Sequence, residues 1–435
     1  MDLSFLGTTL SDHPISRSLY DASNTLSNFQ FLSKDNMDNE VCITFPKIHD
    51  KREDVERDYY DRIPRLINQM ALDRKMPEIK VLKKGAYFAI WGQSRPQLVP
   101  PLASAWAERK GKTFFIDGPG WANPKDEILA DYPKDITTEV EGNFVGFSSS
   151  FPINYGHLIH DHLPVVAWLI SIVPPTTRFI LHYDPDEFGN AVAQQVYGAV
   201  DPSFLNRVLW VKYNEVVHVK NGELTVIIPD KVPTYMGTSF MKPLRKWLTT
   251  NHPDYVNNPN RDHSNGIIIY YTRANAANGL HGRVVEENHE RQIINHIRLA
   301  MARHGRKEHL HIFNGYHNGK PVSIDEQLHL FRSATAAIGP HGSGLANMIW
   351  FDFKRAGSSC DERPKLLEFV AGLDSQIQHP VDGQYLGYNF LFRGLPIDYH
   401  NILYASQSTP TTTYIHLEAL DLALDDMWGG RSEEI

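Results

Sequence analysis

The stretch Ile338-Gly-Pro-His-Gly-Ser-Gly-Leu-Ala-Asn-Met-Ile349 decides the fold, because it places one histidine and three glycines where an apolar strand turns into a helix. Residues 335–338 predict a short buried strand, and residues 345–351 predict an apolar helix whose positive end faces the turn. Gly342 and Gly344 would let backbone N–H groups approach a ligand. This order indicates an α/β domain that could bind a diphosphate, although the same glycines could serve only a tight connection.

The second informative segment is a predicted strand that is followed by an arginine. A run of β-branched and aromatic residues that starts at Ile267 leads directly into Thr272 and Arg273, so the guanidinium emerges at the carboxyl end of a strand, where open α/β sheets bind ligands. Its fixed donors suit a phosphate. Arg283 follows a Gly/Asn-rich loop that could close over the same anion. Alternatively, Arg273 could pair with a nearby carboxylate.

A third segment groups histidines around an aspartate. If residues 155–171 are helical, His157 and Asp161 share a face, with Asn154 on about the same side, whereas His160 is expected to face differently. An imidazole beside a carboxylate can take a proton from a hydroxyl group. Two alternatives remain open. These groups could cap the helix, or the cluster at 157–162 could hold the metal of a metal-dependent hydrolase.

Together, the three segments resemble the glycosyltransferase 61 family, whose motifs occur here in the same order. One departure is Val285, which stands where the family has an asparagine before its paired glutamates. The resemblance implies the GT-B fold, in which two facing Rossmann-like domains enclose an interdomain cleft. The matching positions are Asn154, His157 and Asp161, then Thr272, Arg273, Arg283, Glu286 and Glu287, then Gly339, His341, Gly342, Gly344, Leu345 and Asn347, and finally Glu368.

The resemblance implies an inverting, metal-independent glycosyltransferase. It would move a sugar, xylose or N-acetylglucosamine, from a UDP-sugar to a hydroxyl of a glycan or glycoprotein, with no cofactor besides this co-substrate. Asp161, assisted by His157, is the expected base, and Glu368 is expected to bind the ribose. The other alternative is an inactive nucleotide-sugar-binding protein. The expected donor-binding residues are Thr272, Arg273, Arg283, His341, Gly342, Ser343, Gly344, Asn347 and Glu368, and the expected acceptor-side or orienting residues are Asn154, His160 and Glu287.

Strand and helix patterns alternate along the chain and predict two domains, as expected for 435 residues that are 42% hydrophobic. Strands are predicted at 178–182, 207–211 and 224–228, and helices at 287–304 and 324–333, the latter with a Ser323/Glu326 capping box. The predicted parts are a polar lead at 1–60, an acceptor-side Rossmann-like domain at 61–250, an Asn/Pro-rich linker at 251–266, a nucleotide-sugar-binding Rossmann-like domain at 267–410, and a terminal part at 411–435 whose helix packs back on the first domain.

The amino-acid composition argues against some classes of binding partner and some cellular locations. A formal net charge of −8 with scattered basic residues argues against nucleic acid. The sequence has no apolar stretch of membrane length and no secretory start, and it contains only two cysteines. We therefore expect a cytoplasmic enzyme without a transmembrane segment, or a Golgi or endoplasmic-reticulum enzyme if the sequence is truncated.

Overall fold

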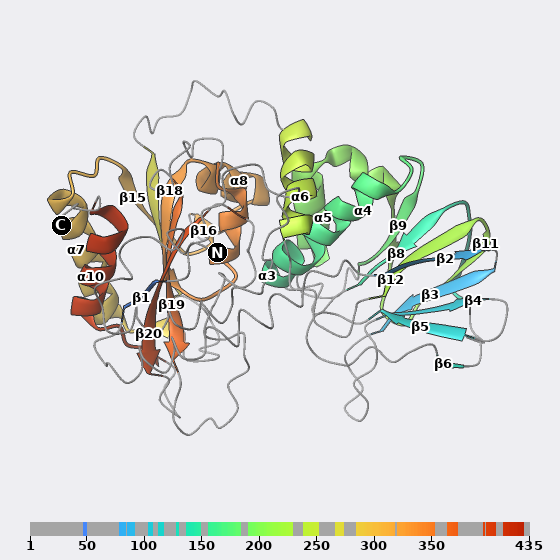
Figure 1. The fold of residues 1–435 in the computed structure, drawn as a ribbon, viewed down its shortest axis with the longest axis horizontal. Coiled ribbons are helices and arrows are strands. Elements are labelled where there is room, and N and C mark those ends of the chain that lie inside the picture. Colours follow the sequence, from blue (N-terminus) through green and yellow to red (C-terminus); the bar gives the residue numbers. More distant parts are fainter. Residues whose placement is uncertain are drawn as a thin grey trace, which may run out of the picture. The chain divides into compact units, whose positions relative to one another are not determined.

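The chain divides into two compact units. We call Leu72–Pro253 the middle unit, and Met1–Ala71 together with Asp254–Ile435 the C-terminal unit. Both combine strands and helices, which confirms the α/β class (Figure 1). Within the described ranges, no helix is both long and apolar enough to cross a membrane. The computed structural model describes residues 47–49, 78–83, 85–91, 103–107, 112–116, 128–129, 136–148, 155–183, 190–228, 238–251, 266–273, 284–317, 320–352, 363–372, 395, 397–405 and 412–429.

Six of the described strands of the C-terminal unit form one sheet in which every neighbouring pair is parallel. Its central strands carry apolar residues on both faces, as is typical of a parallel sheet covered on both sides. In sheet order the strands are β1 (Lys47–His49), β20 (Asp398–Ala405), β19 (Lys365–Gly372), β18 (Ala334–Pro340), β13 (Ile267–Tyr271) and β15 (His309–Phe313).

Strand β1 lies in the part predicted as a polar lead at residues 1–60. Its three residues pair with His400, Asn401 and Ile402 of β20 and extend the sheet by one strand. Three residues are too few to show a periodic pattern in the sequence. The strand is stabilised by its pairing with β20, a strand about 350 residues later in the sequence. Most of the predicted linker, residues 252–265, lies outside the described residues.

The helices of the C-terminal unit begin where the sequence predicts. The capping box at the start of α8 is confirmed, since the Ser323 side chain accepts from the Glu326 backbone and the Glu326 side chain accepts from the Ser323 backbone. The helices are α7 (Glu287–Arg303), α8 (Ile324–Arg332) and α10 (Leu417–Trp428), with the 3-10 helix η7 (Leu345–Trp350) and the two-residue strands β14 (Val284–Val285), β16 (Tyr316–His317), β17 (Lys320–Pro321) and β21 (Thr412–Thr413).

The terminal helix α10 packs on α7 and β20 within its own unit. Its buried residues, among them Leu420 and Leu424, join one apolar core with Ile293 and Ile297 of α7. Helical spacing in the sequence shows which face of α10 is apolar, but not which surface covers that face.

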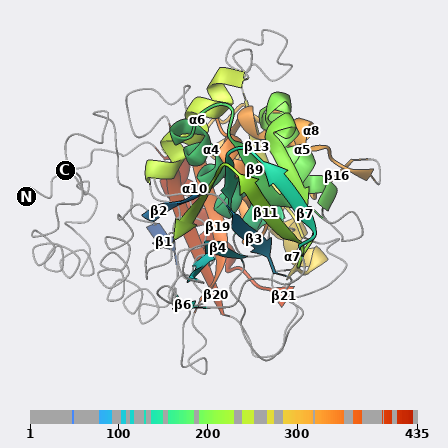
Figure 2. The same ribbon diagram turned by 90° about the vertical axis from the view of Figure 1, so that its right-hand side faces the viewer.

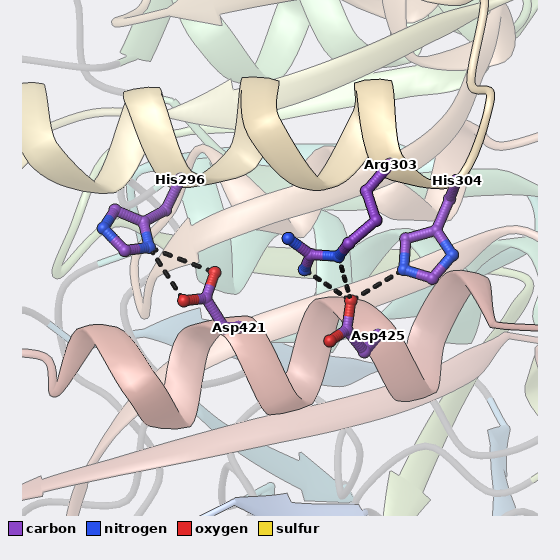
Figure 3. A network of polar contacts seen from close by, with 5 residues as sticks. All are labelled: His296, Arg303, His304, Asp421 and Asp425. Atoms are coloured by element: carbon purple, nitrogen blue, oxygen red, sulfur yellow. Dashed lines mark hydrogen bonds and ion pairs between the residues drawn. The ribbon is translucent and has the colours of Figure 1, made fainter.

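Polar pairs line the contact between α7 and α10 (Figure 3). The Nδ1 of His296 lies 3.0 Å from both carboxylate oxygens of Asp421. One turn further along α10, Oδ1 of Asp425 accepts a hydrogen bond from Nε of Arg303 at 3.0 Å and lies 2.7 Å from Nε2 of His304. These pairs fix the register of α10 along α7.

In the middle unit, one sheet continues the predicted α/β pattern. Four of its strands are parallel, and the edge strand β2 runs antiparallel to β12. In sheet order the strands are β10 (Val208–Val211), β9 (Arg178–His182), β8 (Phe144–Gly146), β12 (Glu223–Ile228) and β2 (Glu78–Lys83), and the helices are α3 (Tyr155–His157), α4 (Leu163–Ile172), α5 (Asn190–Val200) and α6 (Thr238–Asn251), with η4 (Leu158–His162) and η5 (Pro202–Arg207).

The second sheet of the middle unit differs from a Rossmann-like half, because its described strands pair antiparallel except for β7 with β11. Figure 2 shows β11 flanked by β3 and β7. The two sheets pack through one core, and a Cβ on Gly146 would come 2.5 Å from the Phe88 ring, so glycine is needed there. The strands are β6 (Ile128–Leu129), β5 (Lys112–Ile116), β4 (Ala103–Ala107), β3 (Ala86–Ile90), β11 (Val216–Asn221) and β7 (Thr138–Glu141).

Candidate functional site

Two of the predicted segments meet at the carboxyl edge of the parallel sheet in the C-terminal unit. Strand β13 pairs with β18, so Arg273, which follows β13, and His341, which follows β18, emerge side by side. The Nη1 of Arg273 donates to the backbone oxygen of His341 at 3.4 Å. The guanidinium therefore lies against the glycine turn, at the sheet edge where α/β proteins bind ligands.

The glycines of this turn leave space that neighbouring atoms of Tyr271 and Arg273 occupy. A Cβ on Gly342 would lie 2.2 Å from Nη1 of Arg273, and a Cβ on Gly344 would lie 2.2 Å from the Tyr271 ring. Gly339 has a positive φ of 155°, and a Cβ there would come 2.4 Å from the Tyr271 backbone oxygen. Gly342 and Gly344 were predicted either to let a ligand approach or to serve a tight connection, and the structure shows that they make room for Arg273 and Tyr271.

The helix after the turn corrects a prediction. Residues Leu345–Trp350 form the 3-10 helix η7 and not an α-helix, and no side chain caps its start. Because it has only six residues, it contributes little of the dipole that was expected to face an anion. Positive charge at this edge comes from the guanidinium of Arg273.

Asn347 holds the turn from inside the protein. It is fully buried, and its Nδ2 donates to Oε1 of Gln327 at 2.9 Å and to the Gly344 backbone oxygen at 3.1 Å. Its Oδ1 accepts from Nε1 of Trp350 at 3.0 Å. The structure thus places this predicted donor-binding residue in the support of the turn.

Glu368 lies on β19 behind the turn with no exposed surface. One carboxylate oxygen, Oε1, lies 2.5 Å from Nδ1 of His341, and the other accepts from the hydroxyl of Tyr399. The His341 side chain is 26% exposed, so the imidazole connects the buried carboxylate with the surface of the turn. No sequence motif indicates Tyr399, because only the pairing of β19 with β20 brings it to Glu368.

Thr272 and a further carboxylate lie on the α7 side of β13. The Thr272 hydroxyl donates to Oε1 of Glu290 at 2.5 Å, and the Tyr270 hydroxyl donates to the same oxygen at 3.2 Å. Burial raises the pKa of Glu290, and these two hydrogen bonds lower it by less. No sequence pattern indicates Glu290, since a glutamate in the first turn of a helix is ordinary.

The paired glutamates before α7 have structural roles. Glu286 is the N-cap of α7 and accepts from the backbone N–H groups of Asn288 and His289, both at 3.0 Å. These bonds lower the pKa of Glu286. Glu287, the predicted orienting residue, pairs with Arg291 on the exposed surface of α7 at 3.3 Å.

The histidine segment in the middle unit contains a π-helix. Between α3 and α4, residues Leu158–His162 form η4, in which the N–H of Leu163 bonds to the oxygen of Leu158, five residues earlier. This wider turn changes which side chains share a face. The rings of His157 and His160 lie 4.9 Å apart.

Three predicted residues lie wholly or partly outside the described residues. Asn154 and Arg283 are not described, and for Asp161 only the backbone position in η4 is described. Within the described residues, no group of three or more His, Cys, Asp or Glu side chains is arranged to hold a metal ion. Since the side chain of Asp161 is not described, the metal-dependent alternative at 157–162 stays untested.

Comparison with known families decides the broad assignment. Residues 155–357 match the family model described as glycosyltransferase 61. These residues belong to the glycosyltransferase 61 family. The matched region includes the histidine segment, Arg273 and the turn after β18, and it ends before Glu368. A search of curated proteins returned no match. The match indicates a glycosyltransferase, a class of enzyme that acts on a sugar donor and an acceptor.

Proposed function

We propose that the chain is an inverting glycosyltransferase that moves xylose or N-acetylglucosamine from a UDP-sugar to a hydroxyl of a glycan or glycoprotein. The acceptor oxygen forms a bond to the anomeric carbon, the bond from that carbon to the diphosphate breaks, and a base takes the acceptor proton. The observation that carries this proposal is the guanidinium of Arg273 against the turn at His341. No metal ion is required in this proposal.

Arg273 supports the proposal because it has donors for an anion. Its one described hydrogen bond, at 3.4 Å to the His341 backbone oxygen, is long and uses Nη1 alone. A guanidinium has five N–H donors and binds phosphate through two parallel bonds. A fixed positive charge of this kind stabilises the charge that develops on a departing diphosphate.

For the acceptor side we propose Asp161 as the base, assisted by His157. The segment lies in the region that matches the family, and its π-helix is of a kind that occurs frequently at functional sites. In this proposal the two units have the roles of the two GT-B domains, with donor binding in the C-terminal unit and acceptor-side groups in the middle unit. Asp161→Asn is expected to abolish transfer and leave UDP affinity nearly unchanged.

The test measures UDP affinity by isothermal titration calorimetry and transfer from UDP-xylose and UDP-N-acetylglucosamine with and without a chelator. Arg273→Ala should weaken UDP binding about 10- to 100-fold, as loss of a charge-assisted contact does. Arg298→Ala, an exposed arginine of α7, is the matched control and should bind UDP like the wild type. The proposal is wrong if no nucleoside diphosphate binds, or if Arg273→Ala keeps the wild-type affinity. Loss of transfer in the chelator would contradict metal independence.

A further inference from the structure

Four consecutive residues around the end of β13 make contacts in two directions. The side chains of Tyr271 and Arg273 lie against the glycine turn after β18. The side chains of Tyr270 and Thr272 lie toward α7, where both hydroxyls donate to the same oxygen of Glu290. This alternation is typical of extended backbone. The end of the strand is therefore held between the turn on one face and Glu290 on the other.

Glu290 is itself fixed in the first turn of α7. Its backbone N–H donates at 2.8 Å to the oxygen of Glu286, the N-cap of the helix. The residue is buried, and its Oε1 accepts from the Thr272 hydroxyl at 2.5 Å. The backbone N–H of Thr272 donates in addition to the oxygen of Phe313 in β15 at 2.9 Å. Residue 272 is thus held both by its side chain and by its backbone.

Arg273 depends on this support, because its own hydrogen bonding holds it weakly. Among the described residues, its side chain makes one hydrogen bond, which is 3.4 Å long and uses Nη1 alone. One long bond restricts a flexible arginine side chain only slightly, since such a side chain has many rotamers. The place of the guanidinium is therefore set mainly by the direction in which the backbone leaves Thr272.

The acid at position 290 lowers stability when it is ionised. Burial raises the pKa of Glu290, because a carboxylate that leaves water loses favourable solvation, and the hydrogen bonds from two neutral hydroxyls offset only part of this loss. An apolar side chain of similar size would avoid the loss, since replacing buried charged groups by apolar ones often stabilises a protein. A role in holding the end of β13 explains the acid where stability does not.

We propose that Glu290 is a positioning residue, which fixes the end of β13 through Thr272 and thereby holds Arg273 in place for the sugar donor. This inference rests on the proposed function, and it gives Thr272 a role behind the ligand. The carboxyl group acts here as a hydrogen-bond acceptor and not through its charge. Glutamine keeps an acceptor oxygen at the same reach and should therefore replace Glu290, whereas methionine has a similar size but only a weakly accepting sulfur.

The test measures UDP affinity by isothermal titration calorimetry and stability by urea unfolding. Glu290→Met and Thr272→Val should each weaken UDP binding about tenfold, because the guanidinium is displaced, and Glu290→Gln should bind UDP like the wild type. The double variant of Glu290→Met and Thr272→Val should bind no more weakly than either single variant, because both substitutions remove the same contact.

Tyr270→Phe is the matched control. It removes the other hydroxyl from the same oxygen of Glu290, but it lies three residues before Arg273. This variant should keep the wild-type UDP affinity, whatever its stability. A merely structural role of Glu290 would instead lower stability in Tyr270→Phe and Thr272→Val and leave the UDP affinity of both unchanged.

The inference is overturned if Glu290→Met binds UDP like the wild type while Arg273→Ala binds it weakly, or if Glu290→Gln loses as much affinity as Glu290→Met. If Glu290→Met does not fold, Thr272→Val breaks the same contact from the other side and carries the test.

Hydrogen exchange without ligand separates this inference from the proposed function. If the wild type binds no UDP, the proposed function fails, and the exchange measurement alone decides the role of Glu290. Peptides that span residues 268–273, followed by mass spectrometry, should exchange faster in Glu290→Met than in the wild type, and Glu290→Gln should exchange like the wild type. Equal exchange in all three proteins overturns the inference.

Discussion

The substitution of Gly342 by alanine tests the site most directly, because this position has no positive φ and an added Cβ would meet only the side chains of Arg273 and Tyr271. The added Cβ would lie 2.2 Å from Nη1 of Arg273, whereas ordinary contact begins at 3.4 Å. The guanidinium must therefore move by about 1.2 Å, which is enough to break its contact with the His341 oxygen.

The expected effect is on binding and not on folding. The Arg273 tip can move without disturbing a core, so the free energy of unfolding should change by less than about 1 kcal/mol. UDP affinity should fall roughly 10- to 100-fold, because a displacement of about 1 Å in a charge-assisted contact has that effect. Calorimetry with UDP and thermal unfolding without ligand measure the two quantities.

Gly344→Ala is the matched comparison two residues away. Its Cβ would lie between 2.2 and 2.7 Å from three atoms of the Tyr271 ring. A ring is harder to displace than the end of an arginine, so this variant should lose about 1–3 kcal/mol of stability. If Gly342→Ala binds UDP as tightly as the wild type, the guanidinium does not contact the diphosphate, and the argument from Arg273 is refuted.

Three further predictions concern the residues that support the site and its unit. Asp425→Asn should destabilise the contact between α7 and α10 by about 1 kcal/mol at pH 7. Burial raises the pKa of Asp425, but the hydrogen bonds and charges of His304 and Arg303 outweigh burial, so the pKa is lowered overall. The stability difference between the wild type and Asp425→Asn, measured by urea unfolding, should therefore shrink as the pH falls and the native carboxyl of Asp425 becomes protonated. The raised pKa of Glu290 means that the wild-type protein loses stability as the pH rises above the ordinary pKa of a glutamate. Glu290→Gln removes this loss, so the variant should gain in melting temperature relative to the wild type as the pH rises. An equal melting-temperature difference at pH 4 and pH 8 would contradict this. Asn347→Ala should cost about 2–3 kcal/mol by leaving buried hydrogen-bonding groups without their partner, and unchanged urea unfolding would show that the turn does not depend on it.

Much of the C-terminal unit could be predicted from local sequence. The predicted helix at 287–304 is observed at Glu287–Arg303, and the helix at 324–333 is observed at Ile324–Arg332. The position of Arg273 just beyond a strand was also predictable, because a run of β-branched and aromatic residues leads into it. These features depend on residues three or four positions apart, or on alternation within one strand, and therefore leave a pattern in the sequence.

The support of the site depends on neighbours that are distant in the sequence. Tyr399 reaches Glu368 only because β20 pairs with β19, and α10 packs on α7 because their apolar faces share one core. The π-helix at Leu158–His162 likewise leaves no sign in the spacing of its residues. The sequence by itself determined the α/β class, the strand that leads into Arg273 and the glycine turn, since each arises from local periodicity and turn chemistry. Only the tertiary structure decided what lies behind His341 and which surface covers the terminal helix, because strand order and packing partners are set by long-range burial that no local pattern records.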